Sequence, residues 1–149
     1  QQGFEITAVD GSAAGCRKAE LLAKERGVEI TVVHADLAEY RIVPGIWDGL
    51  VKIFGHLPPD LRREVHEACV VRLKPGGKMV LEAYTRDQLQ RGTGGPPVAE
   101  LLMDAEILRD ELEGLEFEIL QETVRDVQEG RHHDGLGAVV QMLAVQPGP

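Results

Sequence analysis

Hydrophobic and polar positions along this chain follow two alternating periods. Dense apolar runs of strand length occupy residues 4–9, 29–35 and 47–54, and apolar residues at every third or fourth position fill residues 12–26 and 61–74. Strands that alternate with helices in this way build a parallel sheet whose two faces are both covered by helices. The pattern therefore predicts an α/β fold with a Rossmann-like, mostly parallel sheet.

The last third of the chain has a different pattern. Asp104 is placed to cap a helix over residues 105–113, and two longer apolar runs follow at residues 116–127 and 138–145. The turn residues between these runs predict an antiparallel hairpin. At 149 residues the chain is long enough to bury one core, and we expect a single domain over residues 1–149.

Capping and turn residues set the expected element bounds. Ser12 is a good N-cap and Gly27 a C-terminal stop for the first helix, and Pro-Gly-Gly at residues 75–77 ends the helix that Asp60 is expected to cap. His66 lies on or beside the solvated face of that helix and receives no role. The charged residues expected on this solvated face are Arg62, Arg63, Glu64, Glu67 and Arg72.

Composition narrows the possible partners. A formal net charge of −9, from acids scattered along the chain, argues against a surface that binds nucleic acid. Cys16 and Cys69 fall in helical patterns without metal-ligand spacing, so we expect two buried thiols in a reducing cytoplasm. Because no apolar run approaches the roughly 20 residues that span a bilayer, we expect no membrane partner.

Carboxylates directly follow the first two strands. Asp10 comes after the first strand and Asp36 after the second. Ligands of open α/β sheets bind beyond the carboxyl ends of the strands, where an acid commonly accepts hydrogen bonds from a ribose. Both residues are therefore candidate nucleotide ligands. The alternatives are that Asp10 is a turn residue that caps the helix, and that both are solvated loop acids.

The third strand ends at Phe54-Gly55-His56. Gly55 lets a ligand approach the backbone, and His56 can hold or move a proton near neutral pH, although structural histidines are more common than catalytic ones. Residues 85–97 are rich in glycine and proline, which fits either a mobile lid over a substrate or a plain connector. The adjacent His132 and His133 have no suitably placed third ligand, so no metal is expected.

These motifs together resemble a class I S-adenosylmethionine-dependent methyltransferase. The resemblance rests on the acids after the first two strands, on Leu-Lys-Pro-Gly-Gly at residues 73–77 and on the terminal hairpin. Residues 54–59 and 82–84 look most like those of the small tellurite-resistance or thiol-type methyltransferases. The resemblance implies methyl transfer to a small-molecule acceptor.

The resemblance also implies a cofactor, S-adenosyl-L-methionine, and the residues that hold it. Asp10 would bind the ribose hydroxyls and Asp36 the adenine. His56 would be the catalytic residue that steers or deprotonates the acceptor, and together with Tyr84 it would contact the substrate. The residues implied for cofactor binding are Asp10, Gly11, Ser12, Asp36, Leu37, Phe54 and Gly55.

One part of the family pattern is missing. The family's first strand and the Gly-rich turn after it have no counterpart, and the chain starts without Met just before the strand at Phe4. We therefore expect a fold truncated at its amino terminus. Because that strand normally lies in the middle of the sheet, its loss leaves two unpaired strand edges. We expect a homodimer or a rearranged sheet, with weak or lost cofactor binding.

Three functions are therefore compared. The first is an enzyme, or a fragment of one, that methylates a small molecule, and the second is a non-catalytic binding or assembly module that keeps the fold but not the cofactor site. The third, a nicotinamide-binding domain, would need a Gly-x-Gly-x-x-Gly turn that the chain lacks.

Overall fold

The computed structural model describes residues 2–130 and 134–148. Its contacts divide the chain into two compact units, Gln1–Arg41 and Ile42–Pro149, called here the amino-terminal and the carboxyl-terminal unit. The expectation of one domain over the whole length stays a prediction.

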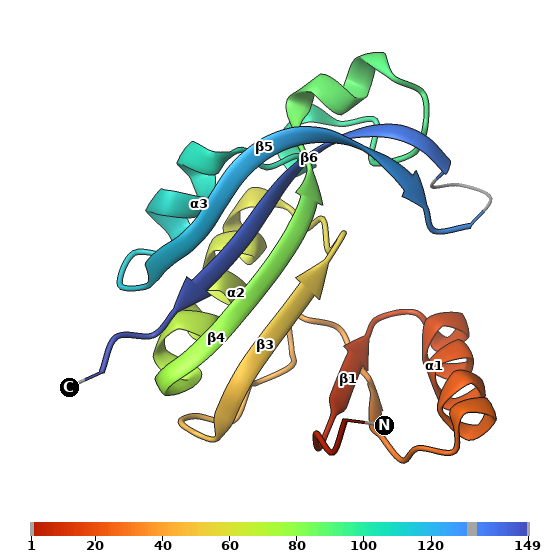
Figure 1. Cartoon of the computed structure of the whole chain (residues 1–149), viewed down its shortest axis with the longest axis vertical. Coiled ribbons are helices and arrows are strands. Elements are labelled where there is room, and N and C mark those ends of the chain that lie inside the picture. Colours follow the sequence, from red (N-terminus) through yellow and green to blue (C-terminus); the bar gives the residue numbers. More distant parts are fainter. Residues whose placement is uncertain (1, 131–133, 149) are drawn as a thin grey trace. The chain divides into compact units, whose positions relative to one another are not determined.

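The amino-terminal unit is built from two parallel strands and one helix (Figure 1). Ser12 caps the helix by accepting a hydrogen bond from the Gly15 N–H, and Gly27 ends it with a left-handed φ of 62°. Both caps are confirmed as predicted, because each depends on residues close by in the chain. The elements are β1 (Thr7–Asp10), α1 (Ala13–Arg26) and β2 (Thr31–His34).

The carboxyl-terminal unit contains a four-stranded sheet with the strand order β3-β4-β6-β5. β3 and β4 are parallel, and the other two pairings are antiparallel. The predicted terminal hairpin is therefore confirmed as β5 and β6. The strands are β3 (Trp47–Ile53), β4 (Leu73–Tyr84), β5 (Glu116–Gln128) and β6 (Asp134–Val145).

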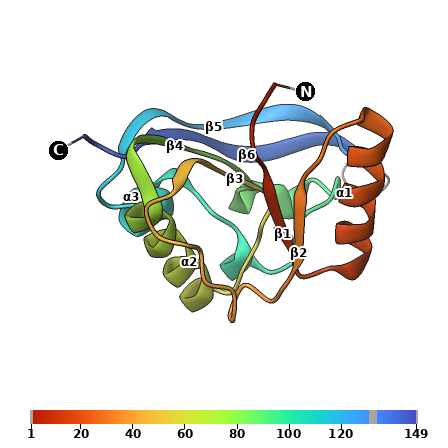
Figure 2. The same cartoon turned by 90° about the horizontal axis from the view of Figure 1, so that it is seen from below.

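Helices α2 (Pro59–Arg72) and α3 (Ala105–Glu111) lie on the same face of this sheet (Figure 2). Two short 3₁₀ turns, η1 (Arg86–Gln90) and η2 (Ala99–Leu101), connect β4 to α3. The main core lies between the helices and the sheet. Its buried residues on the helices include Cys69, Val70, Leu108 and Leu112, and those on the strands include Met79, Leu81, Ala83, Val140, Met142 and Ala144.

The sheet arrangement differs from the predicted single sheet. The described strands form two sheets instead of one, and β1 and β3 each have a single partner among them. Helices α2 and α3 both cover the same face of the four-stranded sheet, and the expectation of helices on both faces stays a prediction. The crossover from β3 to the parallel β4 runs through α2 and puts that helix on one side of the sheet, and α3 packs beside it.

Several element bounds also differ from the prediction. β4 begins at Leu73, before the glycines, because Leu73 pairs with Trp47 and the Gly76 N–H donates to the Gln146 carbonyl at 2.8 Å. Asp60 does not cap α2: Pro58 is the N-cap residue, and Asp60 lies in the first turn. None of the described helices is long and apolar enough to cross a membrane.

Candidate functional site

The two candidate nucleotide-binding acids lie at one edge of the amino-terminal sheet. Asp10 is the last residue of β1 and stands opposite His34, the last residue of β2, and Asp36 follows two positions later. Both acids are exposed. Because β1 and β2 are parallel neighbours, both carboxylates lie beyond the carboxyl ends of strands, where open α/β sheets bind ligands.

The Asp10 carboxylate lies over the first turn of α1. Its Oδ1 accepts a hydrogen bond from the Ser12 N–H at 2.7 Å, so Asp10 acts as the turn residue that the sequence allowed. Its Oδ2 lies so close to Gly15 that a Cβ there would be 2.2 Å away. Gly15 therefore makes room for the carboxylate, and the positive end of α1 favours it. Sequence reasoning missed Gly15, because a helix start does not by itself require a glycine there.

The turns beyond the two strands are also held together. Asp36 Oδ1 accepts from the Ala38 N–H at 2.9 Å, and Leu37 beside it is partly buried. His34 Nε2 lies 3.1 Å from the Gly11 carbonyl oxygen, so the imidazole donates across from β2 to the turn after β1. His34 is a second residue that sequence reasoning missed.

Three aromatic rings stack at the carboxyl ends of β3 and β4. The Phe54 and Tyr84 ring centroids are 4.5 Å apart, and those of His56 and Tyr84 are 5.8 Å apart with nearly parallel planes. Phe54 holds a left-handed φ of 50°, which is unfavourable for a side chain of this size. Strained backbone of this kind is often kept at ligand sites. The structure brings Phe54, His56 and Tyr84 together within this unit, and the roles that the sequence predicts for them stay predictions.

His56 is held by backbone groups on both ring nitrogens. Nδ1 lies 2.9 Å from the Leu101 carbonyl oxygen, which can only accept, so Nδ1 carries the proton. The lone pair is then on Nε2, toward which the Tyr84 N–H donates over a long 3.4 Å. Tyr84 is fully buried, and burial raises the pKa of its hydroxyl. The catalytic role of His56 and the substrate contact of Tyr84 stay predictions.

The glycine-rich segment after β4 is tied to the sheet. The buried Gln88 donates to Thr93 Oγ1 at 3.0 Å and to the Gly94 carbonyl at 2.9 Å, and its Oε1 accepts from the Ala138 N–H of β6 at 2.8 Å. Gly95 lies directly against the Tyr84 ring. The segment is therefore more ordered than a plain connector, and its role as a lid stays a prediction.

A buried polar cluster joins β3, α2 and α3. Lys52 Nζ lies 2.8 Å from His66 Nε2, and His66 Nδ1 lies 2.7 Å from Glu111 Oε2. Arg62 donates to Glu111 from Nε and Nη2. His66 is fully buried and Arg62 is 4% exposed, so the expectation that they lie on or beside a solvated face is wrong. Each is buried because Glu111 of another helix supplies its partner.

Burial sets the protonation of this cluster. It lowers the pKa of Lys52 to about 8, and it also lowers the pKa of His66 below its usual value. Burial alone would raise the pKa of Glu111, but hydrogen bonds from His66 and Arg62 outweigh it and bring that pKa to about 2. The Cys69 thiol nearby stays protonated, because burial raises its pKa to about 11.

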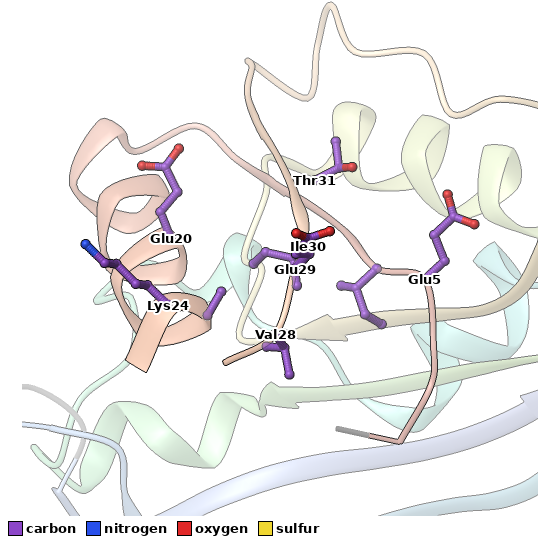
Figure 3. A pocket seen from close by; sticks show the side chains of 9 residues that line it. Glu5, Glu20, Lys24, Val28, Glu29, Ile30 and Thr31 are labelled. Atoms are coloured by element: carbon purple, nitrogen blue, oxygen red, sulfur yellow. The ribbon is translucent and has the colours of Figure 1, made fainter. Parts of the chain in front are cut away.

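An open pocket lies at the other end of the amino-terminal sheet (Figure 3). It is bounded by Glu5 and Ile6 before β1, by residues 28–31 at the start of β2, and by Glu20 and Lys24 of α1. Glu5, Ile6 and residues 28–31 lie at the amino-terminal ends of β1 and β2, so the pocket is at the end of the strands opposite to Asp10 and Asp36.

The part of the chain that the structure describes offers no metal centre. No three His, Cys, Asp or Glu side chains within it are grouped as metal ligands. The candidate pair His132 and His133 lies outside the described residues.

Comparison with known proteins relates the fold to methyltransferases. No family model and no curated protein matches the sequence. TehB from Haemophilus influenzae superposes with a TM-score of 0.74 at 15% identity, over 97% of this chain and 50% of its own. A SAM-dependent methyltransferase from Methanosarcina mazei gives 0.72 at 16% identity, over 99% and 84%. The N-methyltransferase NodS from Bradyrhizobium japonicum, solved with S-adenosyl-L-homocysteine, gives 0.68 at 16%, over 96% and 67%.

At these identities the likeness concerns the fold alone. The chain has the fold of S-adenosylmethionine-dependent methyltransferases, which confirms the coarse resemblance inferred from the sequence. The tellurite-resistance or thiol-type subtype stays a prediction. The chain spans half the length of TehB and about two thirds of NodS.

Proposed function

We propose that this chain binds S-adenosyl-L-methionine and takes part in methyl transfer to a small-molecule acceptor. The observation that carries the proposal is the pair of exposed carboxylates, Asp10 and Asp36, beyond the carboxyl ends of adjacent parallel strands. The hydroxyls of a ribose and the amine of an adenine are donors that such carboxylates accept. The fold shared with methyltransferases supports this choice of nucleotide.

The residues at this edge fit the adenosine part of the cofactor. Asp10 would accept from the ribose hydroxyls, with Gly11 and Ser12 beside it, and Asp36 with Leu37 would hold the adenine. The space that Gly15 leaves keeps the Asp10 carboxylate in its place at the strand end. When bound, the cofactor supplies an electrophilic methyl group on a sulfonium.

The aromatic stack would lie at the end of the cofactor that carries the reacting methyl group. Phe54 and Gly55 would line the methionine part of the cofactor, and Tyr84 supports the rings of Phe54 and His56. His56 has its lone pair on Nε2, which accepts the Tyr84 N–H over a long 3.4 Å, so this nitrogen would exchange that hydrogen bond for the proton that the acceptor loses as its nucleophile attacks the methyl carbon. Holding the acceptor in line and away from water would supply most of the rate enhancement.

A small, soft nucleophile such as a thiol is the acceptor that we propose. This choice rests on the resemblance of residues 54–59 and 82–84 to thiol-type and tellurite-resistance methyltransferases. We place the reaction in the cytoplasm, which agrees with two free cysteine thiols, Cys16 and Cys69.

Calorimetric titration with S-adenosyl-L-homocysteine tests the cofactor site. Because the Gly-rich turn of the family has no counterpart in this chain, binding is expected to be weak, and Asp10→Ala is expected to weaken it by about a further tenfold, since a hydrogen bond to a charged group is lost. Asp48→Ala is the matched control, because Asp48 is an exposed carboxylate whose partner is Lys74. Binding that Asp10→Ala and Asp36→Ala both leave unchanged would place the cofactor elsewhere.

A transfer assay tests the reacting end. With labelled S-adenosyl-L-methionine and a panel of small thiols, His56→Asn is expected to lower kcat while S-adenosyl-L-homocysteine still binds. Equal turnover by His56→Asn and the unaltered chain would contradict the proton-accepting role.

A non-catalytic binding or assembly module is the second candidate. The observation in its favour is the division of the strands into two sheets, because the residues proposed for the adenosine and for the methyl group then belong to different units. A folded chain that does not bind S-adenosyl-L-homocysteine would favour this candidate over the enzyme.

A further inference from the structure

The imidazole of His56 depends on η2 for its tautomer. Its Nδ1 lies 2.9 Å from the carbonyl oxygen of Leu101, the last residue of η2. That carbonyl can only accept, so the contact keeps the proton on Nδ1 and leaves the lone pair on Nε2. Whatever fixes the Leu101 carbonyl therefore also decides which nitrogen of His56 can take up a proton.

The η2 turn has little structure of its own to hold this carbonyl in place. It is three residues long, and its N-cap residue is Val98, whose side chain offers no acceptor to the first turn. Its two backbone hydrogen bonds are 3.2 and 3.1 Å long, at the weak end of the normal N–H···O range. Short 3₁₀ turns of this kind depend on contacts with the rest of the fold.

Two contacts anchor the backbone on either side of Leu101. After it, the Met103 N–H donates to the Tyr84 carbonyl at 3.1 Å. Before it, Nη1 of Arg62 donates to the Glu100 carbonyl at 3.0 Å. The second anchor comes from a side chain on α2 that is 4% exposed. A buried cation therefore holds the peptide group next to the one that contacts His56.

A guanidinium suits this position because it divides its donors between two partners. Nε and Nη2 of Arg62 donate to Glu111 at 3.1 and 2.9 Å, which leaves Nη1 for the Glu100 carbonyl. Because the fork is planar and rigid, the ion pair with Glu111 sets the direction of Nη1. A buried ion pair is weak evidence for stability by itself, since apolar residues often replace one without loss. Apolar side chains could not supply the donor to Glu100.

We propose that Arg62 is a positioning residue for His56 and acts through the backbone of η2. Glu111 fixes the guanidinium, and the guanidinium fixes the Glu100 carbonyl. The next carbonyl along the chain, that of Leu101, holds the proton on Nδ1. The inference rests on the proposed role of His56 as proton acceptor, which requires an unprotonated Nε2.

The tautomer of His56 in the full chain tests this inference without any turnover. It is read from the ring nitrogen chemical shifts by NMR on the alkaline side of neutrality, where an ordinary imidazole is uncharged. The signals that are missing in His56→Asn identify the ring. We expect the proton on Nδ1 in the unaltered chain.

The decisive variant is Arg62→Met/Glu111→Gln. It removes the donor to Glu100 and leaves no buried charge of the pair without its partner, while the new amide oxygen at residue 111 can still accept from His66 Nδ1. We expect a share of the His56 rings to carry the proton on Nε2 instead. With labelled S-adenosyl-L-methionine, kcat should fall by about tenfold or more, since a base in the wrong tautomer contributes nothing. The affinity for S-adenosyl-L-homocysteine should not change.

Val70→Ala is the matched control for a general loss of stability. Val70 is a buried core residue of the same helix, so its truncation loosens the packing of α2 but removes no donor to η2. This variant should be less stable and keep the proton of His56 on Nδ1.

Three results would overturn the inference. One is a proton on Nε2 in the unaltered chain, the second is a tautomer that the double variant leaves unchanged, and the third is an equal shift in Val70→Ala. If the double variant fails to fold by circular dichroism, Arg62→Lys replaces it under the same criteria, because an ammonium neutralises Glu111 but lacks the planar fork. Absence of both turnover and S-adenosyl-L-homocysteine binding would contradict the proposed function instead, and the tautomer would still decide whether Arg62 positions His56.

Discussion

Arg62 and Glu111 form a buried ion pair between α2 and α3. Arg62 Nη2 lies 2.9 Å from Glu111 Oε1, and the two side chains are 5% and 3% exposed. A buried charge is costly without its counter-charge, because the interior solvates it poorly. The packing of α2 against α3 therefore depends on this ion pair being intact.

Neutralising one partner is expected to cost much of the stability. Glu111→Gln keeps the shape of the side chain but leaves the Arg62 guanidinium buried without an anion. We expect the free energy of unfolding to fall by about 3 kcal/mol, near the range seen when one partner of a buried pair is removed. Urea unfolding near neutral pH measures it.

The neighbouring pair on the same helices is the control. Arg63 Nη2 lies 2.6 Å from Asp110 Oδ2, but the side chains are 48% and 66% exposed. Asp110→Asn is expected to cost less than about 1 kcal/mol, because water screens an exposed pair. If Glu111→Gln and Asp110→Asn lowered the free energy of unfolding equally, burial would not be the reason for the larger effect expected at Glu111.

Acid is expected to destabilise the fold through His66. Burial lowers the pKa of His66 in the folded chain, while in the unfolded chain the side chain takes up a proton near pH 6.5. The unfolded state therefore binds more protons below this pH, and the free energy of unfolding falls as the pH drops below about 6.5. Glu111, with a folded pKa of about 2, adds a second decline below about pH 4.3.

The test measures the free energy of unfolding of the unaltered chain and of His66→Gln at about pH 7 and at about pH 5. The variant is less stable at both values but should lose the part of the decline that His66 causes. His34→Gln, at an exposed histidine, should keep the decline of the unaltered chain. A slope that His66→Gln leaves unchanged would show that another group titrates.

Local signals explain which parts of the fold could be predicted. The caps at Ser12 and Asp104 depend on groups three residues away, so the sequence alone identifies them. The buried charges do not follow from local pattern. Arg62 pairs with Glu111, which lies 49 residues later in the sequence. A helical arginine without such a partner is expected to be exposed to solvent. The division into two sheets also depends on long-range pairing.

The part of the candidate site at the carboxyl ends of the strands could be predicted from the sequence. Asp10 and Asp36 share an edge because their strands are parallel neighbours, which alternation of strands and helices implies. The contribution of Gly15 was not predictable, because it depends on where the Asp10 carboxylate points.

Gly15→Ala is expected to bring no stability, although alanine favours a helix over glycine by about 1 kcal/mol. The new Cβ would lie 2.2 Å from Asp10 Oδ2, so the carboxylate must move and its hydrogen bond from the Ser12 N–H is disturbed. Thermal unfolding measures the net effect, and amide exchange of Ser12 reports the disturbed bond.

A double-mutant cycle separates the two contributions. In Asp10→Ala the carboxylate is absent, and adding Gly15→Ala to this variant should then raise stability by up to about 1 kcal/mol. The same gain in the presence and absence of Asp10 would contradict the steric conflict between the two positions.

Gln88 is expected to control access to the glycine-rich segment. Its amide joins Thr93, Gly94 and Ala138, so Gln88→Ala removes three hydrogen bonds and leaves the Ala138 N–H of β6 without its acceptor. We expect a loss of about 2 kcal/mol in the free energy of unfolding, within the usual cost of an unsatisfied buried group. Trypsin is also expected to cleave after the exposed Arg91 faster than in the unaltered chain.

Gln90→Ala is the control, because Gln90 lies in the same 3₁₀ turn but is exposed. It should leave both the stability and the cleavage rate unchanged. Faster cleavage in Gln88→Ala at conditions where the chain stays globally folded would mean that the segment opens locally. Cleavage that follows global unfolding in every variant would instead mean that residues 91–97 open only when the sheet does, which would argue against a lid.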